Sequence, residues 1–485
     1  MNHESNTTGK RSSWSNQFTF ILAAAASAIG LGNLWRFPYL AARYGGGTFI
    51  LIYLILVVTL GFTLMTTEIA IGRKTQQSQL TAYSRLHGGF GALGLLSTII
   101  PMLIVPYYCV IGGWVLKYFW TYFQIICGSD TAASALAESG AFFGGFISAP
   151  FAPFGFAMLF ILATAGVIVC GVKNGIEKSN SVMMPLLFVF AIAISVYVCC
   201  QPGSGAGLKY YLVPNMDCLR DVGEDGVARF SFAQLGKTIL GAMGQMFYSL
   251  SLAMGIMITY GSYMRKGDSI EKSVRRIEVF DTLIAVIAGL MIIPVVYSFA
   301  VSSGTPVKEA MNAGPGLMFI TLPKVFASFG AAGPWIGASF FLLVIFAALT
   351  SAISLMEACV ASVCDLLHME RKPATFFTAA LVAFLATFSA IGYGPWAKIT
   401  VFKFQFLDFF DFITNSVLMP IVAAVTCIFV GWVLGPKVVE DEVRAEGNEF
   451  HASGLYRVMV RYFAPLLVIA ILVSEVLRAL GMFSI

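Results

Sequence analysis

The sequence predicts an all-α membrane protein with eleven transmembrane helices. Hydrophobic residues make up 58% of its 485 residues and charged residues only 11%, whereas a soluble domain carries about 25% charged residues. The mean hydropathy is +0.82, and the apolar residues gather in runs that reach the roughly 20 residues a helix needs to cross a bilayer. So few charges cannot cover a water-facing surface, which excludes a soluble globule, a disordered chain and a coiled coil.

Eleven apolar runs follow one another along the chain, and we expect each to form one spanning helix. Their approximate bounds are 16–42, 46–71, 92–124, 153–171, 179–200, 235–262, 276–303, 331–363, 374–394, 404–435 and 455–482. Several contain Gly or Pro, which spanning helices tolerate because neighbouring helices can satisfy the freed backbone groups. Residues 310–327 are apolar but too short to span, so we expect an outer loop that dips back toward the membrane.

The distribution of basic residues predicts the orientation, because cytoplasmic loops carry an excess of Lys and Arg. With the N-terminus inside, 18 of the 30 Lys and Arg residues fall on cytoplasmic segments and 11 on the outer side. The odd number of spans then puts the C-terminus outside. The first run shares with a signal peptide a basic residue before an apolar stretch, but it continues as a full span and no soluble domain follows it.

Two spans carry small and polar residues at mid-membrane. Gly30 and Gly32 interrupt the first span, and Ser249 and Ser251 interrupt the sixth ahead of Gly255. Each feature alone is typical of helix packing in membranes. The two segments lie five spans apart, however, and an odd offset inverts the second copy in the bilayer. We therefore predict a 5+5 inverted repeat whose discontinuous helices 1 and 6 offer bare carbonyls and amides to a cation and an anion.

The chain divides accordingly into five parts. They are an N-terminal segment at 1–15, the first repeat at 16–200, an extracellular loop at 201–234, the second repeat at 235–435 and an eleventh helix at 455–485.

Several motifs resemble those of one transporter family. They read SAIGLGNLWRFPYLAARYGGGTFILIY, EIAIGR, GQMFYSLSLAMG, TYGSYMRK and ALTSAISLMEA. The chain resembles the neurotransmitter:sodium symporter family over nearly its whole length, and most closely its bacterial, leucine-transporter-like amino-acid transporters. The resemblance implies sodium-coupled uptake of an amino acid by alternating access across the inner membrane of a bacterium, with residues 1–15 as a cytoplasmic latch.

The resemblance implies two sodium sites with oxygen ligands, which a hard cation prefers. The first would combine the substrate carboxylate with Ala28, Asn33, Ser249 and Asp281, so that ion and substrate share a contact. The second would use carbonyls and hydroxyls of Ala26, Ile29, Ala347, Thr350 and Ser351. From the residues alone, hydroxyls that bond back to their own helix explain the Thr350–Ser351 pair equally well.

Asp281 is a carboxylate early in the apolar run VFDTLIAVIAGLMIIP, where an ion or proton role is the default expectation. Chloride-dependent members of the family have Asn at this position and a Ser four residues later, beside the chloride. Here the later residue is Ala285, while Tyr53, Gln245 and Ser249 match the family's other chloride-contacting positions. We infer that Asp281 supplies the negative charge that chloride supplies elsewhere, which predicts chloride-independent transport. Whether Asp281 carries a proton on the return step stays open.

The resemblance places the substrate between the two breaks. Its carboxylate would meet Leu31, Gly32 and Tyr108, and its ammonium would meet Ala28, Tyr248, Ser249 and Ser251. Its side chain would lie against Ser27, Ile104, Tyr248, Met254, Ser354 and Leu355. A charged side chain would be unpaired in this mostly apolar end, at a cost of several kcal/mol. We therefore predict a neutral hydrophobic L-amino acid, and the adaptable Met254 favours larger or aromatic ones.

Closures on both faces are also implied by the resemblance. The extracellular gate would pair Arg36 with Asp411 through water, beneath which Tyr108 and Tyr248 form a lid; Asp408 is a rival partner. The intracellular gate would comprise Arg11, Trp14, Ser262, Tyr263 and Asp365. From the residues alone, Arg11 and Asp365 are explained as well by ordinary solvated charges and the excess of basic residues on the cytoplasmic side, and partly exposed pairs contribute only about 0–1 kcal/mol. Such weak pairs suit contacts that break in every cycle.

Three further residues have implied structural roles. Glu68 would cap backbone amides freed by the break in the sixth span. Gly175 and Pro185, which both weaken helices, would mark a stretch of the fifth span that unwinds to let water reach the second sodium site.

Other function classes find little support in the sequence. It shows no nucleophile–base pair, metal cluster or phosphate loop, so we do not expect an enzyme. Basic residues spread over short loops do not indicate a nucleic-acid partner. We expect a lipid bilayer, an amino acid and two Na⁺ ions as partners, and a monomer or weak dimer. A channel would need no paired gates, whereas a substrate sensor on a transporter scaffold stays open as an alternative.

Overall fold

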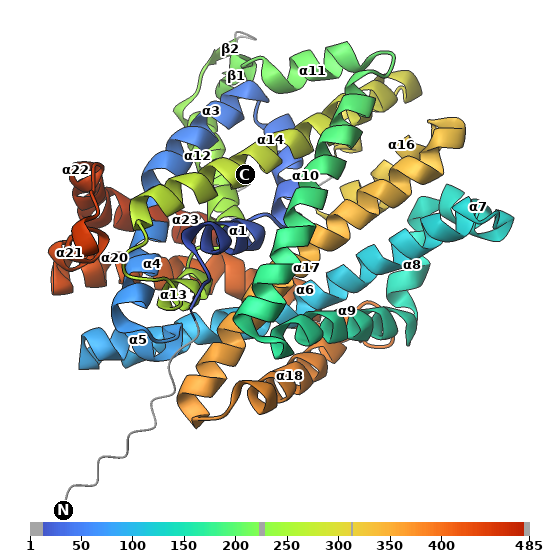
Figure 1. Cartoon of the computed structure of the whole chain (residues 1–485). Helices are drawn as coiled ribbons and strands as arrows, with labels where there is room; N and C mark the ends of the chain where they lie inside the picture. Colours follow the sequence, from blue (N-terminus) through green and yellow to red (C-terminus); the bar gives the residue numbers. More distant parts are fainter. Residues whose placement is uncertain (1–12, 223–227, 312–313, 480–485) are drawn as a thin grey trace, which may run out of the picture.

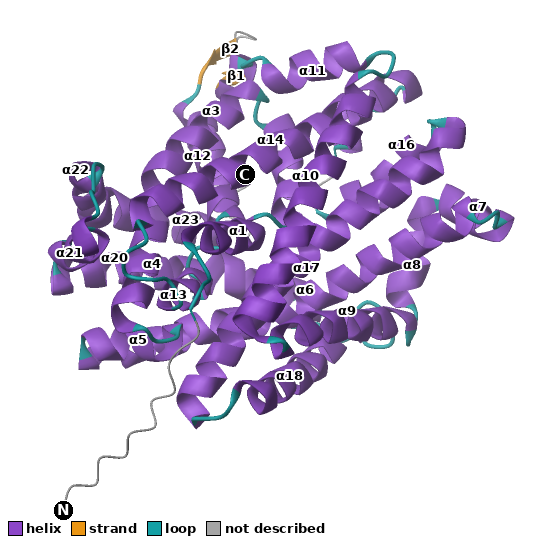
Figure 2. Ribbon diagram, in the orientation of Figure 1, coloured by secondary structure: helices purple, strands orange, loops and turns teal. Residues whose placement is uncertain are grey.

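The computed structural model describes residues 13–222, 228–311 and 314–479. Within these ranges the chain is almost entirely helical, and a short antiparallel hairpin of β1 (Arg220–Val222) and β2 (Ala228–Phe230) stands at one end of the molecule (Figure 2). Nine helices of the described part are long and apolar enough to cross a membrane, or ten if the bent first pair counts as one span. The chain is thus a helical membrane protein.

The first half of the chain contains five predicted spans and short connecting helices (Figure 1), with η denoting π or 3₁₀ turns. The spans are α1 (Gln17–Ala28), η1 (Gly32–Arg36) and α2 (Phe37–Arg43); α3 (Gly47–Leu56), η2 (Val57–Gly61) and α4 (Phe62–Thr75); α6 (Gly91–Ile126); α9 (Ala152–Val169); and η4 (Val172–Glu177) with α10 (Lys178–Cys199). The connections hold α5 (Gln79–Leu86), η3 (Gly88–Phe90), α7 (Asp130–Ala137), α8 (Ser139–Ser148), α11 (Ser204–Leu212) and η5 (Met216–Leu219).

The second half contains the remaining predicted spans. They are α12 (Phe232–Ser249) and α13 (Ile256–Ser262); α14 (Ile270–Ser303); α17 (Gly333–Leu367); α18 (Arg371–Ile391); α19 (Phe406–Asp411), η8 (Phe412–Leu418), α20 (Met419–Ile428) and η9 (Phe429–Leu434); and α22 (Ser453–Val458), η11 (Met459–Phe463) and α23 (Ala464–Ala479). The connections hold α15 (Val307–Ala310), η6 (Leu317–Thr321), α16 (Leu322–Ala327), η7 (Gly330–Ala332), α21 (Lys437–Val443) and η10 (Ala445–Gly447).

The first span is broken between α1 and η1, where the axis bends by 54°. Gly30 lies in this break, and a Cβ there would come within 2.7 Å of Ser351 Oγ and 3.0 Å of the Tyr108 hydroxyl oxygen. A larger residue would therefore push apart the helices that pack on the break. The preceding helix α1 is buried on every side from Phe20 to Ala28, so the break lies at the centre of the bundle.

The sixth span is broken between Ser249 and Ile256. The helix α12 has 18 residues and α13 only seven, and neither is among the helices that are long and apolar enough to cross a membrane alone. Ser251, Ala253 and Gly255 in this break have φ values of +52°, +59° and +71°. Left-handed backbone is costly for residues other than glycine and needs support from its surroundings. Part of that support comes from Glu68, whose Oε1 accepts a hydrogen bond of 2.7 Å from the amide of Ala253.

The fifth span is helical throughout, so the implied unwinding between Gly175 and Pro185 is absent from this conformation. Gly175 lies in the π turn η4, and α10 continues through Pro185. Proline removes only one helical hydrogen bond, and α10 packs closely on α14 and α17. Tertiary packing therefore holds a stretch whose sequence weakens a helix.

Candidate functional site

The two breaks face each other across a small cavity at the centre of the bundle. Its volume is about 20 Å³, and its lining consists of Ser27, Ala28, Gly30, Leu31, Gly32, Asn33, Ile104, Tyr108, Tyr248, Ser251, Met254, Ser351 and Leu355. This volume accommodates about one water molecule. An amino acid would enter only if the walls moved apart.

All but two of the predicted substrate contacts line this cavity. Ser249 instead belongs to a polar cluster beside it. Ser354 donates to the carbonyl of Thr350 and accepts a bond of 2.8 Å from the hydroxyl of Tyr260. Gly32 lies against the Tyr248 ring so closely that a Cβ would come within 2.5 Å of it, which makes glycine necessary at this point.

Direct hydrogen bonds join the two breaks. Ser251 Oγ donates to the carbonyl of Ser27 at 3.1 Å, and Gln245 Nε2 donates to the carbonyl of Gly32 at 3.1 Å. The amide of Leu31 points at the Tyr108 hydroxyl from 3.4 Å. These contacts occupy main-chain groups that a zwitterionic ligand could otherwise engage.

A buried polar cluster surrounds Asp281 next to the cavity. Its carboxylate accepts hydrogen bonds from Asn33 Nδ2 at 2.8 Å, from Ser249 Oγ at 2.9 Å and from the Tyr53 hydroxyl at 3.1 Å. All four side chains are at most 1% exposed. The cluster joins α14 to both broken spans and to α3. Loss of the Asp281 carboxylate would therefore remove a hydrogen bond from each of these elements.

The donor set of this cluster fits a hard cation, because it contains a carboxylate, a hydroxyl and an amide. Asn33 turns its nitrogen toward Asp281, while its Oδ1 accepts a bond of 3.1 Å from the amide of Gly30. Turning the amide over would direct that oxygen toward an ion held by the carboxylate and Ser249. Ala28, the remaining predicted ligand, lines the adjacent cavity.

A second set of oxygens lies between α17 and the first break. Ser351 Oγ donates to the carbonyls of Ser27 at 3.1 Å and Ile29 at 3.2 Å. Thr350 Oγ1 instead bonds back to Phe346 and Ala347 on its own helix. Thr350 thus bonds back to its own helix, as the alternative interpretation of the Thr350–Ser351 pair expects, whereas Ser351 donates its hydrogen bonds to the first span. Ala26 and Ala347 are fully buried, and hydroxyls with carbonyls form a donor set that also fits a hard cation.

A larger cavity of about 390 Å³ lies between the break region and the end of the bundle opposite the N-terminus. Arg36, Asp408, Asp411, Tyr107, Tyr248, Glu475 and Arg478 are among its lining residues. Tyr248 also lines the central cavity and so separates the two, while Tyr108 lines only the central one. Of the two implied lid residues, only Tyr248 therefore touches both spaces.

No direct ion pair joins Arg36 to Asp411 among the described residues. The Arg36 guanidinium lies 5.9 Å from the centre of the Tyr248 ring. Asp411 accepts hydrogen bonds from the Tyr107 hydroxyl at 3.1 Å and from Asn415 Nδ2 at 2.6 Å. The rival Asp408 accepts from Tyr393. The sequence did not predict a gate role for Tyr107 or Asn415. Tyr107 is adjacent to the predicted residue Tyr108, but the two tyrosines face different cavities.

At the opposite end, Trp14 closes the bundle. It is 1% exposed, its amide donates to the carbonyl of Tyr263 at 3.1 Å, and its indole nitrogen donates to the carbonyl of Tyr260 at 3.0 Å. Asp365 accepts a bond of 2.7 Å from the amide of Ser78, and Ser262 Oγ bonds to the carbonyl of Thr259. Arg11, the other implied gate residue, lies outside the described residues.

A buried ion pair near Trp14 was not singled out by the sequence. Glu357 is 0% exposed and accepts two bonds from Arg371, at 2.9 and 2.5 Å, and one of 2.8 Å from the Tyr263 hydroxyl. The available signal was a carboxylate within the apolar stretch SLMEACV. The pair ties α17 and α18 to the end of α13, which also holds Trp14.

Comparisons with known proteins agree with this architecture. The model of the sodium:neurotransmitter symporter family matches residues 11–133 and 154–482. YhdH of Bacillus subtilis, named an uncharacterized sodium-dependent transporter, is 31% identical over 472 residues, covering 95% of this chain and 97% of YhdH. The human sodium- and chloride-dependent GABA transporter 2 is 25% identical over 481 residues, covering 91% of this chain and 76% of that protein.

A solved structure shares the fold. The crystal structure of MhsT in complex with L-phenylalanine matches with a TM-score of 0.81 and 32% sequence identity, covering 96% of this chain and all of MhsT. The family match covers most of the chain, including both breaks, the Asp281 cluster and both ends of the bundle. The chain therefore belongs to the sodium:neurotransmitter symporter family.

Proposed function

We propose that this protein is a symporter that couples sodium entry to uptake of a neutral hydrophobic or aromatic L-amino acid by alternating access. The observation that carries the proposal is the meeting of two broken helices at one cavity, next to the buried Asn33–Ser249–Asp281 cluster. Family membership and the likeness to phenylalanine-bound MhsT support sodium-coupled amino-acid symport.

The two oxygen clusters would hold two Na⁺ ions. At the first, Asp281, Ser249 and Asn33 would hold an ion that also meets the substrate carboxylate, so that neither ligand binds well alone. At the second, Ser351 would hold an ion between α17 and the first span. Each cation that crosses the membrane contributes about 2.3 kcal/mol per 100 mV, so two ions can drive the accumulation of a zwitterion.

Chloride independence follows from the composition of the first cluster. Asp281 already provides a buried negative charge with three hydrogen-bond donors, and Ala285, one turn away, is fully buried and offers no hydroxyl. A second anion beside Asp281 would be repelled at short range in a medium of low dielectric constant. The human relative whose name includes chloride dependence matches over 91% of this chain, which makes the anion requirement a sharp test.

The apolar wall of the central cavity supports the substrate class. Ile104, Met254 and Leu355 line it, and none of the described residues contributes a charged side chain to the lining. A charged substrate side chain would have no partner there. The likeness to MhsT, which was crystallised with L-phenylalanine, agrees with a large apolar substrate.

The remaining elements complete an alternating-access cycle. We assign eleven spans in a 5+5 inverted repeat, with the N-terminus in the cytoplasm, the C-terminus outside and a bacterial inner membrane as location. Trp14, Tyr263 and the Glu357–Arg371 pair then form the inner closure, and Arg36, Asp411 and Tyr248 border the outer cavity. We expect a monomer or weak dimer.

Uptake into proteoliposomes tests this function directly. We expect L-phenylalanine or a similar amino acid to accumulate only when sodium is outside, to stop when potassium replaces it, and to continue when gluconate replaces chloride. Preference for glutamate or lysine would contradict the substrate class. Sodium-dependent binding without any uptake would instead favour a substrate sensor.

A further inference from the structure

A buried arginine lies at the end of α4, away from both sodium clusters. The side chain of Arg73 is 0% exposed although it stands close to the inner surface. Its Nε donates to Glu442 Oε1 at 2.8 Å, and its Nη2 donates to the carbonyl of the same residue. Glu442 belongs to α21, which connects the tenth and eleventh spans. Arg73 therefore joins the second span to a segment 369 residues further along the chain.

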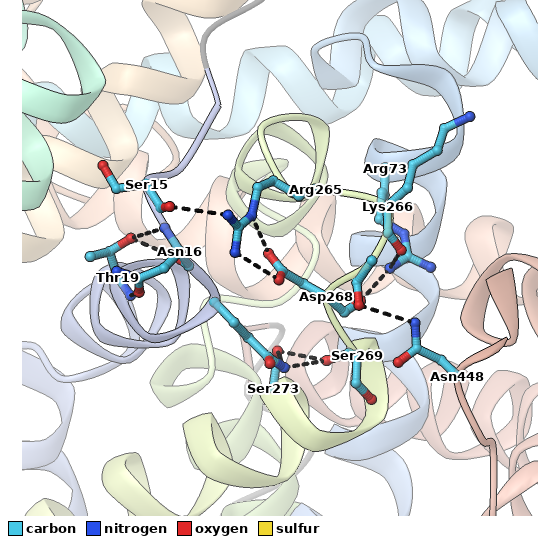
Figure 3. A network of polar contacts seen from close by, with 12 residues as sticks. Ser15, Asn16, Thr19, Arg73, Arg265, Lys266, Asp268, Ser269, Ser273 and Asn448 are labelled. Atoms are coloured by element: carbon cyan, nitrogen blue, oxygen red, sulfur yellow. Dashed lines mark hydrogen bonds and ion pairs between the residues drawn. The ribbon is translucent and has the colours of Figure 1, made fainter. Parts of the chain in front are cut away.

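The third nitrogen of Arg73 holds the loop 264–269, which links α13 to α14. Its Nη1 donates to the carbonyls of Asp268 at 2.6 Å and Lys266 at 3.3 Å (Figure 3). Asn448, which follows α21, donates to the carbonyl of Gly267 at 3.4 Å. The loop thus rests on groups supplied by α4 and by the segment between the last two spans.

The same loop holds the start of the first span. Arg265 binds both oxygens of Asp268, at 3.2 and 3.1 Å, and donates to the carbonyl of Ser15 at 3.2 Å (Figure 3). Gln17 Nε2 donates to the carbonyl of Ser269 and to Ser273 Oγ, both at 2.9 Å. A continuous series of hydrogen bonds therefore runs from Glu442 through Arg73 and the loop to residues 15–17, next to Trp14.

The support beneath this series is rigid. A Cβ on Gly72 would collide with the main-chain carbonyl of Ile258 in α13, and one on Gly261 would come within 2.5 Å of the carbonyl oxygen of Ile69 in α4. The backbones of α4 and α13 therefore touch directly, and Arg73 follows at the end of that contact. Whatever displaces Arg73 displaces the loop relative to the first span.

We propose that Arg73 is a positioning residue of the inner closure, and that through it α21 helps to hold the first span in place. This inference rests on the proposed function. Arg73 does not touch substrate or ion; it fixes the carbonyl-rich loop on which residues 15–17 rest. Loss of its charge or of its partner Glu442 would let the inner half of the first span leave the bundle more often.

Linkage between conformation and ion binding provides the test, because sodium should favour the state in which the inner face is closed. We would measure hydrogen exchange of residues 14–28 in the full chain in detergent while sodium is titrated against potassium. The variants are Arg73→Gln and Glu442→Gln. The matched control is Arg444→Gln, because Arg444 is half exposed and pairs with Glu440 rather than with the loop.

We expect both variants to exchange faster at residues 14–28 and to need about fivefold more sodium for half protection, while Arg444→Gln behaves like wild type. Faster exchange throughout α4 and α13 with an unchanged sodium midpoint would overturn the proposal, because it indicates a merely structural role. If Arg73→Gln does not fold, Arg265→Gln, which removes the contact to Ser15 and the ion pair with Asp268 but leaves Arg73 and Glu442 in place, must still raise the midpoint. Sodium-independent exchange in wild type would also overturn it. Because this measurement needs no amino acid, failure of the proposed transport function appears separately, in the uptake assay.

Discussion

The two ends of the bundle are closed in different ways. At the end that we propose faces the cytoplasm, here called the inner end, Trp14 is 1% exposed and Glu357 is 0% exposed, with two bonds from Arg371. At the outer end, a cavity of about 390 Å³ reaches down to Tyr248, and Asp411 is held by the neutral groups of Tyr107 and Asn415. The inner closure contains an ion pair whose carboxylate is fully buried and whose arginine is 24% exposed, whereas the outer end holds a cavity bordered by the Tyr248 ring.

This difference indicates which end of the bundle costs more free energy to open. Each hydrogen bond from these neutral donors to the Asp411 carboxylate contributes about 1.5–3 kcal/mol, so the outer residues can rearrange one bond at a time at a moderate cost. A fully buried carboxylate such as that of Glu357 loses several kcal/mol if its charged partner is removed without replacement. Separating the Glu357–Arg371 pair therefore costs more than rearranging the hydrogen bonds of Asp411, so we expect the inner end to open less readily than the outer end.

The largest effect should follow from breaking the inner ion pair. Arg371→Gln leaves the buried carboxylate of Glu357 with the Tyr263 hydroxyl as its remaining donor, and we expect a loss of about 3–5 kcal/mol in the free energy of unfolding. Denaturant titration of the purified protein measures it. The double variant Glu357→Gln/Arg371→Gln should recover much of the loss. Equal losses in the single and double variants would show that the unpaired charge of Glu357 is not the source of the loss.

A substitution in the Asp281 cluster, at the centre of the bundle, should lower transport without changing the contacts that close either end. Asp281→Ala removes the acceptor of three buried hydrogen bonds, and bonds to charged groups contribute about 1.5–3 kcal/mol each. We expect sodium-dependent uptake to fall by about a hundredfold or more. Uptake at several sodium concentrations measures this, and near-normal rates at any of them would remove Asp281 from the ion site.

The support of the sixth break should depend on an acceptor rather than on charge. Glu68→Ala leaves the buried amide of Ala253 without a partner, at a cost of about 1–3 kcal/mol. Glu68→Gln keeps an acceptor oxygen and should cost clearly less. Thermal stability and sodium-dependent uptake of the two variants provide the comparison. A Gln variant as damaged as the Ala variant would mean that the negative charge itself matters.

The smallest effect should come from the outer end. Tyr107→Phe removes one hydrogen bond to the carboxylate of Asp411, worth about 1.5 kcal/mol at the low end for a charged acceptor, and should speed substrate release by roughly tenfold. Tyr210→Phe serves as the control, because its hydroxyl bonds to the carbonyl of Ala42, away from this cavity. If Tyr107→Phe lowers the free energy of unfolding as much as Arg371→Gln does, the proposed contrast between the two ends is wrong.

The sequence by itself determined the features that depend on local pattern. Apolar runs located the helices because burial in lipid demands about 20 consecutive apolar residues. Gly30 and Ser251 marked the two breaks because small or polar residues at mid-membrane weaken a helix that lipid would otherwise stabilise. Asp281 was conspicuous because a carboxylate within such a run needs a partner.

Only the tertiary structure decided which of these residues meet. Arg73 and Glu442 are far apart in the chain, and no local pattern relates them. Tyr107 and Tyr108 are adjacent in sequence yet face different cavities, and Pro185 stays helical because its neighbours pack on it. Hydropathy and spacing report only which groups must be satisfied, whereas the choice of partner depends on how helices distant in the sequence pack against one another.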